Sequence, residues 1–263
     1  MKRMLLVASP MIVKPLSGGC INKVYLVKQD SGYAVLKEND SVPADFFAAE
    51  EHGLHCLAQH GLPVPKVIQC EPKQIYLEYL EPGKHEFEKA GRELALLHLQ
   101  SQPEFGLSRN NYIGSLIQQN SLEKDWLSFW KNFRIKPMLK LLDNPDKKLW
   151  DSYLENIHLW LGSEFHSSPL HGDLWGGNLH FSGGKAFFID PAFYYGDAMV
   201  DLAMTQLFGG FPSNFYDSYK ETGGEFLAEK ISHYQVYPIL VHAVLFGGAY
   251  YQQALGIIKR FLS

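Results

Sequence analysis

The segment from residue 170 to residue 192, LHGDLWGGNLHFSGGKAFFIDPA, constrains this chain more than any other stretch. It gathers carboxylates, an amide and a histidine into short polar loops, and apolar runs bound these loops. The arrangement suits metal-assisted chemistry better than core packing, because carboxylate and amide oxygens are ligands of hard cations. A site of this kind needs further partners from elsewhere in the chain.

The first loop has the spacing of a kinase catalytic loop, with His171, Asp173 and Asn178 at His-x-Asp-x-x-x-x-Asn. A short strand predicted over residues 185–189 then delivers Asp190. Phosphoryl transfer needs a group that accepts the proton of the attacking hydroxyl, together with Mg²⁺ ligands. We predict that Asp173 is this base. Asn178 and Asp190 are the predicted metal ligands, since an amide oxygen binds Mg²⁺ without adding charge.

A purely structural interpretation of the same residues exists, because Asp and Asn beside glycines often form turns and cap helices. Three oxygen-bearing side chains at this joint spacing, the last one delivered by Phe187-Phe188-Ile189, favour the chemical interpretation.

A β-hairpin is predicted near the N-terminus, from Val24–Val27 and Tyr33–Leu36 with a turn at Asp30–Gly32. Lys37 ends the second strand on the same face as Val35. If that face lines a cleft, the Lys37 ammonium could pair with nucleotide phosphates. Taken alone, a lysine at a strand end is more often solvated.

The segment Ser17-Gly18-Gly19-Cys20 precedes the hairpin. Because glycine has no Cβ, its backbone N–H groups could approach a phosphate, although paired glycines more often form only a turn. In such a loop Cys20 could be an oxidisable thiol, and the simpler interpretation is a small residue in a turn. Residues 1–13 are expected to hold a first strand rather than a signal peptide, since Ser9 and Pro10 interrupt the apolar run.

A helix is predicted over Ala44–His60, with Gly61 ending it. Glu50 lies within this helix and could orient Lys37 through an ion pair. Glu51 points about 100° away, so only one of the two glutamates can do so.

A strand over Gln74–Leu80 is followed by Glu81-Pro82-Gly83, which we take as a boundary between two lobes. The rest of the chain is predicted to be mainly helical, with helices over Glu86–Leu99, from about Leu122, over Lys147–Glu164, and in most of the chain after Pro212. The helix from about Leu122 is expected to place four aromatic residues in the core: Trp126, Phe129, Trp130 and Phe133. An ordered loop is expected over Pro103–Asn120. His98 is assigned by default to packing or capping. Four other residues could border the pocket of the acceptor and are assigned by default to packing: His233, His242, Tyr250 and Tyr251.

A net charge of −4 offers no broad basic field, so neither nucleic acid nor an anionic membrane is an expected partner. The three cysteines form no CxxC pair, which favours the reducing cytoplasm over a disulfide framework. The longest apolar stretch, Val236–Gly248, contains Pro238 and His242 and is too short and interrupted to span a bilayer.

Over nearly its whole length the chain resembles the fructosamine kinase (ketosamine 3-kinase) family, a branch of the aminoglycoside phosphotransferase group with a protein-kinase-like fold. The resemblance rests on LHGDLWGGN, IDPAFYYGD and DLAMTQLFGGFP, and it extends to LSGGCIN, LEYL, NNYIG and DWLSFW in order. This chain departs from the family at Gly176, where serine is usual.

The resemblance implies an α+β fold of two lobes, a nucleotide-binding lobe at residues 1–81 and a helical lobe at residues 82–263, with ATP and Mg²⁺ between them. It implies Asp173 as catalytic base and Asn178 and Asp190 as metal ligands. It also implies a set of nucleotide-binding residues: Gly18 and Gly19 over the phosphates, Lys37 on the phosphates with Glu50 as its partner, and Glu78 and Leu80 at the adenine hinge.

Three other residues have two interpretations each. Helix capping is the simplest role for Asp201, and the resemblance implies that it bonds the catalytic-loop backbone. Asp197 could face a cationic or polyhydroxyl substrate or form a turn. Trp175 could stack on a sugar or pack against its lobe.

The implied substrate is a ketosamine, carried by a small amine or by a glycated protein lysine, in an enzyme that is a monomer or a weak homodimer. Two alternatives remain at this point. One is a kinase that acts on an aminoglycoside or on a choline-like amino alcohol. The other is a catalytically silent nucleotide-binding module, which Lys37, Asp173, Asn178 and Asp190 together disfavour.

Overall fold

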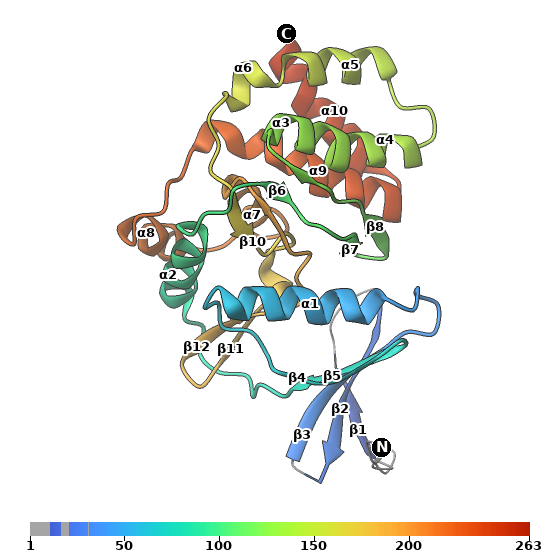
Figure 1. Cartoon of the computed structure of the whole chain (residues 1–263), viewed down its shortest axis with the longest axis vertical. Helices are drawn as coiled ribbons and strands as arrows, with labels where there is room; N and C mark the ends of the chain where they lie inside the picture. Colours follow the sequence, from blue (N-terminus) through green and yellow to red (C-terminus); the bar gives the residue numbers. More distant parts are fainter. Residues whose placement is uncertain (1–10, 17–20, 31) are drawn as a thin grey trace.

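The computed structural model describes residues 11–16, 21–30 and 32–263. The N-terminal part is an antiparallel sheet in the order β1-β2-β3-β5-β4 (Figure 1). Its strands are β1 (Met11–Pro15), β2 (Lys23–Gln29), β3 (Gly32–Glu38), β4 (Val67–Glu71) and β5 (Gln74–Glu78). The predicted hairpin is confirmed as β2 and β3, paired from Lys23–Glu38 to Gln29–Gly32. The predicted phosphate loop, with Gly18, Gly19 and Cys20, lies outside the described residues.

Helix α1 (Phe46–Gln59) crosses one face of this sheet and lies between the sheet and the rest of the molecule (Figure 1). Phe46, Phe47 and Leu54 of α1 form a buried cluster with Ile75 and Leu77 of the sheet. The helix ends as predicted at Gly61, whose φ of +85° is a conformation that glycine adopts without steric cost. Burial of this apolar face fixes the position of α1 over β3, which carries Lys37.

The C-terminal part begins with helix α2 (Phe87–His98) and is mainly helical. Short β-ladders and helices follow: β6 (Phe105–Gly106), β7 (Asn111–Ile113), β8 (Leu116–Gln118), β9 (Leu122–Glu123), α3 (Trp126–Phe129), a π-helix (Trp130–Ile135), α4 (Lys136–Leu141), α5 (Lys147–Asn156) and α6 (His158–Leu161). The chain continues through β10 (Ser168–Leu170), a 3₁₀ turn (Gly176–Asn178), β11 (Leu179–Ser182), β12 (Lys185–Phe188), β13 (Tyr194–Gly196), α7 (Met199–Met204), α8 (Ser213–Glu221), α9 (Ala228–Phe246) and α10 (Ala249–Leu262).

Two predicted helices differ from the structure. The tryptophan-rich helix begins at Trp126 rather than near Leu122, because the carboxylate of Asp125 accepts a hydrogen bond from Ser128 N at 2.8 Å and caps the helix there. The predicted helix over Lys147–Glu164 is two short helices, separated at Ile157. Its apolar residues still pack into the large C-terminal core.

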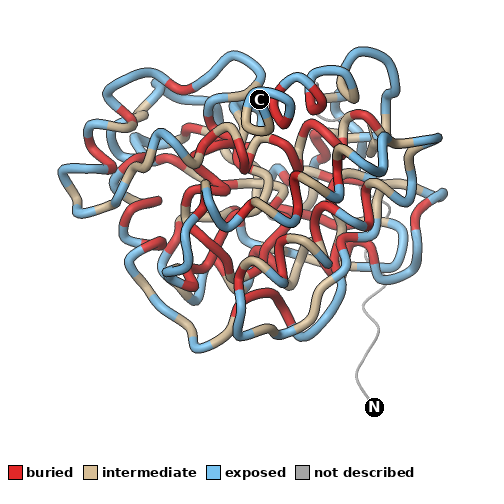
Figure 2. The backbone as a smooth tube through the Cα atoms, turned by 90° about the horizontal axis from the view of Figure 1, so that it is seen from above, coloured by how far each residue is buried: buried red, intermediate tan, exposed pale blue. Residues whose placement is uncertain are grey.

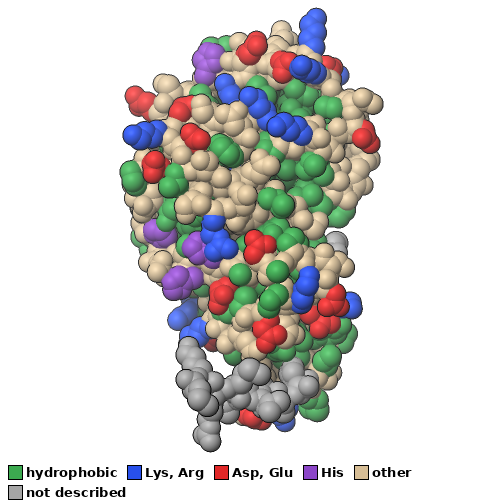
Figure 3. All heavy atoms as spheres, turned by 45° about the vertical axis from the view of Figure 1, so that its right-hand side comes forward, with side chains coloured by type: hydrophobic (Ala, Val, Ile, Leu, Met, Phe, Trp, Pro, Cys, Tyr) green, Lys and Arg blue, Asp and Glu red, His purple; other side chains and the backbone are tan. Residues whose placement is uncertain are grey.

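The predicted α+β fold class is confirmed, with a small sheet lobe and a larger helical part. Buried backbone segments gather in the interior, and exposed segments lie at the periphery (Figure 2). Acidic and basic side chains are both spread over the face seen in Figure 3. Across residues 11–16, 21–30 and 32–263, no helix has the length and apolar character needed to cross a bilayer. The predicted lobe boundary after Glu81 falls in the connection between β5 and α2 and stays a prediction.

Candidate active site

Two loops carry the predicted catalytic residues, and each follows a buried strand. The loop that starts at His171 leaves β10, which pairs with β13, and it leads through the 3₁₀ turn into β11. The hairpin of β11 and β12 then delivers Asp190, which has a φ of +56°. Aspartate tolerates this left-handed conformation better than most residues. The local turn follows β12 and places Asp190 where its carboxylate pairs with Lys37 of β3.

Backbone hydrogen bonds hold the two loops together. Ile189 N donates to Asn178 O at 3.0 Å, and Ala192 N donates to His171 O at 2.9 Å. Gly172 has a φ of +84°, and a Cβ there would lie 2.2 Å from Ala192 O, so only glycine allows this close approach. The loops form one rigid unit as a result.

The imidazole of His171 is fully buried and connects the same two loops. Its Nε2 donates to Ile189 O at 2.9 Å, and its Nδ1 accepts from Asp173 N at 3.3 Å. Burial lowers the pKa of His171, whereas the charge of Asp201 acts to raise it. The lowered pKa favours the neutral ring, which this pair of bonds requires because one nitrogen donates and the other accepts. His171 thus serves as a positioning residue for both loops.

Asp201 supports this loop from the interior. Its carboxylate accepts hydrogen bonds from the backbone N of His171 at 2.7 Å and of Gly172 at 2.8 Å, as the resemblance implies. His98, expected to be packed or capping, lies 3.2 Å from the same carboxylate. The capping prediction for Asp201 is wrong, because α7 begins at Met199 and the side chain that accepts from Met199 N is that of Asp197.

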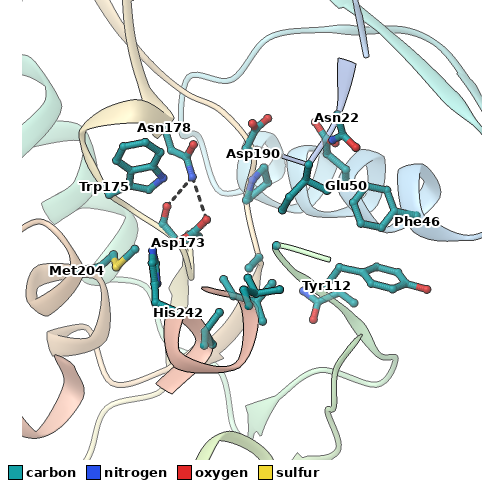
Figure 4. Close-up of a pocket in the computed structure, with 18 of the residues that line it drawn as sticks. Asn22, Phe46, Glu50, Tyr112, Asp173, Trp175, Asn178, Asp190, Met204 and His242 are labelled. Atoms are coloured by element: carbon teal, nitrogen blue, oxygen red, sulfur yellow. Dashed lines mark hydrogen bonds between the residues drawn. The ribbon is translucent and has the colours of Figure 1, made fainter. Parts of the chain in front are cut away.

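One cavity of about 540 Å³ contains five of the predicted site residues (Figure 4). They come from three distant segments of the chain: Lys37 from β3, Glu50 from α1, and Asp173, Asn178 and Asp190 from the two loops. The cavity therefore lies between the sheet lobe and the helical part, where the sequence predicts the reaction to occur.

Asp173 and Asn178 contact each other in this cavity. Asn178 Nδ2 donates to Asp173 Oδ2 at 3.1 Å and to Asp173 O at 2.8 Å, so the amide oxygen of Asn178 faces away from Asp173 and is available to a ligand. Burial raises the pKa of Asp173 to about 7, although the hydrogen bond from Asn178 lowers it. A carboxyl with a pKa near neutrality is suited to proton transfer.

The Lys37 ammonium binds two carboxylates. It lies 2.7 Å from Glu50 Oε1 and also pairs with Asp190 Oδ1. Lys37 and Glu50 are largely buried, whereas the Asp190 side chain is 40% exposed. The open side of Asp190 leaves its Oδ2 accessible from the cavity.

A buried network of amides holds the segment after Asp190 from the other side. Gln118 Nε2 donates to Ala192 O at 3.1 Å and to Asn111 Oδ1 at 2.9 Å. Asn111 Nδ2 in turn donates to Phe193 O at 2.9 Å. The sequence prediction missed Gln118, and the only signal for Asn111 was its place in NNYIG.

Other predicted residues lie outside the cavity. Glu78 ends β5, where its carboxylate accepts from Lys66 N at 3.2 Å, and the Leu80 carbonyl accepts from His180 Nε2 at 2.8 Å. Asp197 is buried away from the cavity, with Tyr234 donating to it at 2.5 Å, so it does not face the candidate site.

His242 and Tyr250 line the cavity, the alternative to packing that the sequence left open, and Tyr250 also packs against the core of the helical part. Trp175 also lines the cavity and meets Phe208 edge to face at 6.5 Å between ring centroids. His233 and Tyr251 do pack as predicted: His233 is fully buried, and Tyr251 binds Asp146 N and Trp150 Nε1.

Comparison with known proteins gives consistent results. The family model for fructosamine kinase matches residues 8–263. A "probable ketoamine kinase" from Enterococcus faecium is 33% identical, over 95% of this chain and 95% of its own length. A "protein-ribulosamine 3-kinase, chloroplastic" from Oryza sativa subsp. indica is 31% identical, over 95% of this chain and 78% of its own length.

Solved structures agree with these relatives. The crystal structure of a candidate fructosamine-3-kinase from Thermobifida fusca superposes with a TM-score of 0.85 at 30% identity, covering 97% of this chain and 94% of that one. A choline/ethanolamine kinase family protein from Mesorhizobium loti reaches a TM-score of 0.63 at 15% identity, covering 100% and 91%, and shares the fold. The protein-kinase-like fold is confirmed, and the chain belongs to the fructosamine kinase family.

Proposed function

We propose that this protein is an ATP-dependent kinase that phosphorylates a sugar hydroxyl of a ketosamine. The observation that carries the proposal is the meeting of Lys37, Glu50, Asp173, Asn178 and Asp190 in one cavity of a fructosamine kinase family member. Relatives named ketoamine kinase and ribulosamine 3-kinase support the substrate class.

The residues in this cavity suit a Mg²⁺ ion. Asn178 donates from its amide nitrogen to Asp173, so its amide oxygen can bind a ligand. Asp190 pairs with Lys37 through Oδ1. Asn178 Oδ1 and Asp190 Oδ2 would hold the ion, since Mg²⁺ prefers oxygen ligands and takes the remaining ones from water and phosphates. Bound there, Mg²⁺ neutralises charge on the transferring phosphoryl group.

The chain's own groups account for the proton transfer. Asp173 accepts the proton of the sugar hydroxyl while the oxygen of that hydroxyl forms a bond to the γ-phosphorus. The bond from the γ-phosphorus to the bridging oxygen breaks, and ADP is released. The hydrogen bond from Asn178 orients the Asp173 carboxylate toward the cavity. Lys37, oriented by Glu50, binds the α- and β-phosphates.

The predicted binding of adenine by backbone groups of Glu78 and Leu80, and of phosphates by the loop with Gly18 and Gly19, belongs to the same proposal. The 2.8 Å hydrogen bond from His180 to Leu80 O fixes the hinge against β11 and leaves the Leu80 N–H as the group for adenine. The acceptor is a small-molecule ketosamine or a glycated protein lysine.

The decisive experiment measures ADP release by the purified protein with ATP, Mg²⁺ and a fructosamine or ribulosamine. We expect turnover by the wild-type protein. Asp173→Ala should lower kcat by several orders of magnitude and should leave nucleotide affinity, measured by calorimetry with a non-hydrolysable ATP analogue, within a few-fold of wild type.

The same assay separates the alternatives. A choline- or aminoglycoside-type kinase would turn over those amines in preference to ketosamines. A silent nucleotide-binding module would bind the ATP analogue and release no ADP with any acceptor, and this outcome would refute the proposal.

A further inference from the structure

The tetrapeptide Leu-Phe-Gly-Gly occurs twice in this chain, at residues 207–210 and 245–248. In each copy the leucine packs partly against the core of the helical part. Each phenylalanine is instead exposed, Phe208 to 43% and Phe246 to 54%, and each lines the cavity that contains Asp173. Two turns of the same sequence thus present an aromatic ring at the mouth of one cavity.

The backbone holds both rings in unusual ways. Phe208 has a φ of +55°, a left-handed conformation that is strained for a bulky residue, and such strain clusters at functional sites. Phe246 is the last residue of α9, and Gly247 and Gly248, at φ values of +66° and +65°, reverse the chain into α10. Exposed rings at such backbone positions do not contribute to core packing, which favours a binding role for Phe208 and Phe246.

Two further rings join these phenylalanines. His242 lies 4.4 Å from Phe208, 5.4 Å from Phe246 and 5.2 Å from Tyr250, measured between ring centroids. We call Phe208, His242, Phe246 and Tyr250 the aromatic rim. His242 and Met204 line the same cavity as Asp173 (Figure 4), so the rim and the predicted catalytic base share one cavity.

Charge is unevenly distributed in the cavity. Its charged side chains, among the residues that the structure describes, are Lys37, Glu50, Asp173 and Asp190, and none belongs to the rim. His242 donates from Nδ1 to Pro238 O at 2.8 Å, which leaves Nε2 as a hydrogen-bond acceptor. Burial lowers the pKa of His242, which favours the neutral ring. The rim therefore carries no acidic or basic side chain, and its polar groups are the His242 ring and the Tyr250 hydroxyl.

We infer that the aromatic rim binds the amine-side substituent of the ketosamine, and that the preferred substituent is apolar. The inference rests on the proposed function. In a ketosamine the amine on C1 is two carbons from the 3-hydroxyl, so the substituent must lie within the same cavity as Asp173. Lys37 and Asp190 occupy the phosphate end, and the rim is an aromatic wall of the same cavity that carries no acidic or basic side chain and can take the substituent.

The chemistry of the rim ranks the possible substituents. Aromatic faces bind apolar groups and attract the protonated secondary amine through cation–π contact, and His242 Nε2 can accept its N–H. A carboxylate on the substituent would lose water against these faces and would find no cationic partner on the rim. Apolar substituents should therefore react best, cationic ones next and anionic ones worst.

Three fructosamines of nearly equal shape test this order, made from benzylamine, 4-(aminomethyl)benzylamine and 4-(aminomethyl)benzoate. We expect kcat/KM for the benzyl compound to exceed that for the benzoate by about tenfold or more. Phe208→Ala and Phe246→Ala should each reduce this ratio toward one. Leu159→Ala, which removes a 65% exposed side chain on α6, should leave the ratio unchanged.

A reversal of preference is the sharper test. Phe246→Arg places a guanidinium at the rim, in place of a side chain that is already exposed to solvent, so the protein should fold. The kcat/KM for the benzoate should then rise relative to that for the benzyl compound. Equal kcat/KM for all three compounds, or a wild-type preference for the benzoate, would overturn the inference and leave the proposed function intact. No turnover of these three compounds or of the matching ribulosamines would refute the proposed function instead.

Discussion

Asp201 accepts a hydrogen bond from the backbone N–H of His171 at 2.7 Å, at the start of the loop that carries Asp173. The second oxygen of the same carboxylate accepts from Gly172 N at 2.8 Å. Asp201 is fully buried, and its lone pairs are directed at this loop and at His98. A buried charge held by backbone donors in this way fixes a loop strongly, because releasing it would leave the charge unpaired.

Asp201→Asn is therefore expected to lower kcat by at least about tenfold and the free energy of unfolding by about 3 kcal/mol, because the amide can accept from only one of the two N–H groups and turns its own donors toward the other. Urea unfolding and steady-state kinetics measure the two effects. The control is Asp217→Asn on the exposed surface of α8, which should change neither. A wild-type kcat for Asp201→Asn would show that this carboxylate does not position the loop.

Glu50→Gln tests the orientation of Lys37. The ammonium would lose the charge of its 2.7 Å partner and would be left with Asp190, a proposed Mg²⁺ ligand. We expect KM for ATP to rise about fivefold to tenfold at saturating acceptor, since the buried ion pair contributes to phosphate binding. Glu51→Gln, one residue along the helix, should leave KM for ATP unchanged. An equal rise in both variants would indicate a general effect of helix charge.

Local motifs made the candidate site residues of this chain predictable. The chemistry of phosphoryl transfer fixes the spacing of Asp173 and Asn178 within one loop, and an apolar strand must deliver Asp190. The hairpin and α1 were predictable for the same reason, since period-two and helical patterns are local. The cavity now joins these residues to Lys37 and Glu50.

Features that depend on long-range contacts were not predictable from the sequence. Gln118 binds Ala192, 74 residues away, and no local pattern marks that contact. Phe208 and Phe246 are 38 residues apart in the sequence, and no local pattern predicts that both line one cavity. Asp201 was assigned to a helix cap because its helix was placed two residues too late along the chain.

The network of Asn111 and Gln118 suggests a test on the opposite side of the loop that carries Asp190. Gln118→Leu leaves Ala192 O and the Tyr237 hydroxyl without their partner in buried surroundings, and Asn111 Oδ1 keeps only its 2.8 Å bond from Asn120 Nδ2. Such losses cost about 1–3 kcal/mol per group, so we expect the unfolding free energy to fall by about 3 kcal/mol and kcat to fall with it. Gln119→Leu alters the neighbouring exposed side chain and is the matched control. If kcat stays at the wild-type value while stability falls, the network supports folding only.

His233 predicts how stability depends on pH. Burial among Tyr153, Trp160 and Phe261 lowers the pKa of His233 to about 4, below the value of about 6.5 for an unfolded chain. Between these two values the unfolded state binds more protons than the folded state, so stability is fully present above pH 6.5 and falls as the pH drops toward 4.

The measurement compares urea unfolding at pH 7 and pH 5. The wild-type protein should lose up to about 2 kcal/mol through His233 over this interval. His233→Gln keeps a side-chain acceptor near the hydroxyl of Tyr153, which lies 3.0 Å from His233 Nδ1, and removes the titration. Its pH dependence should be weaker by that amount. The control is His158→Gln, which replaces an exposed ring on α6 and should retain the wild-type pH dependence. An identical pH dependence in wild type and His233→Gln would show that the buried ring does not set the acid sensitivity of the fold.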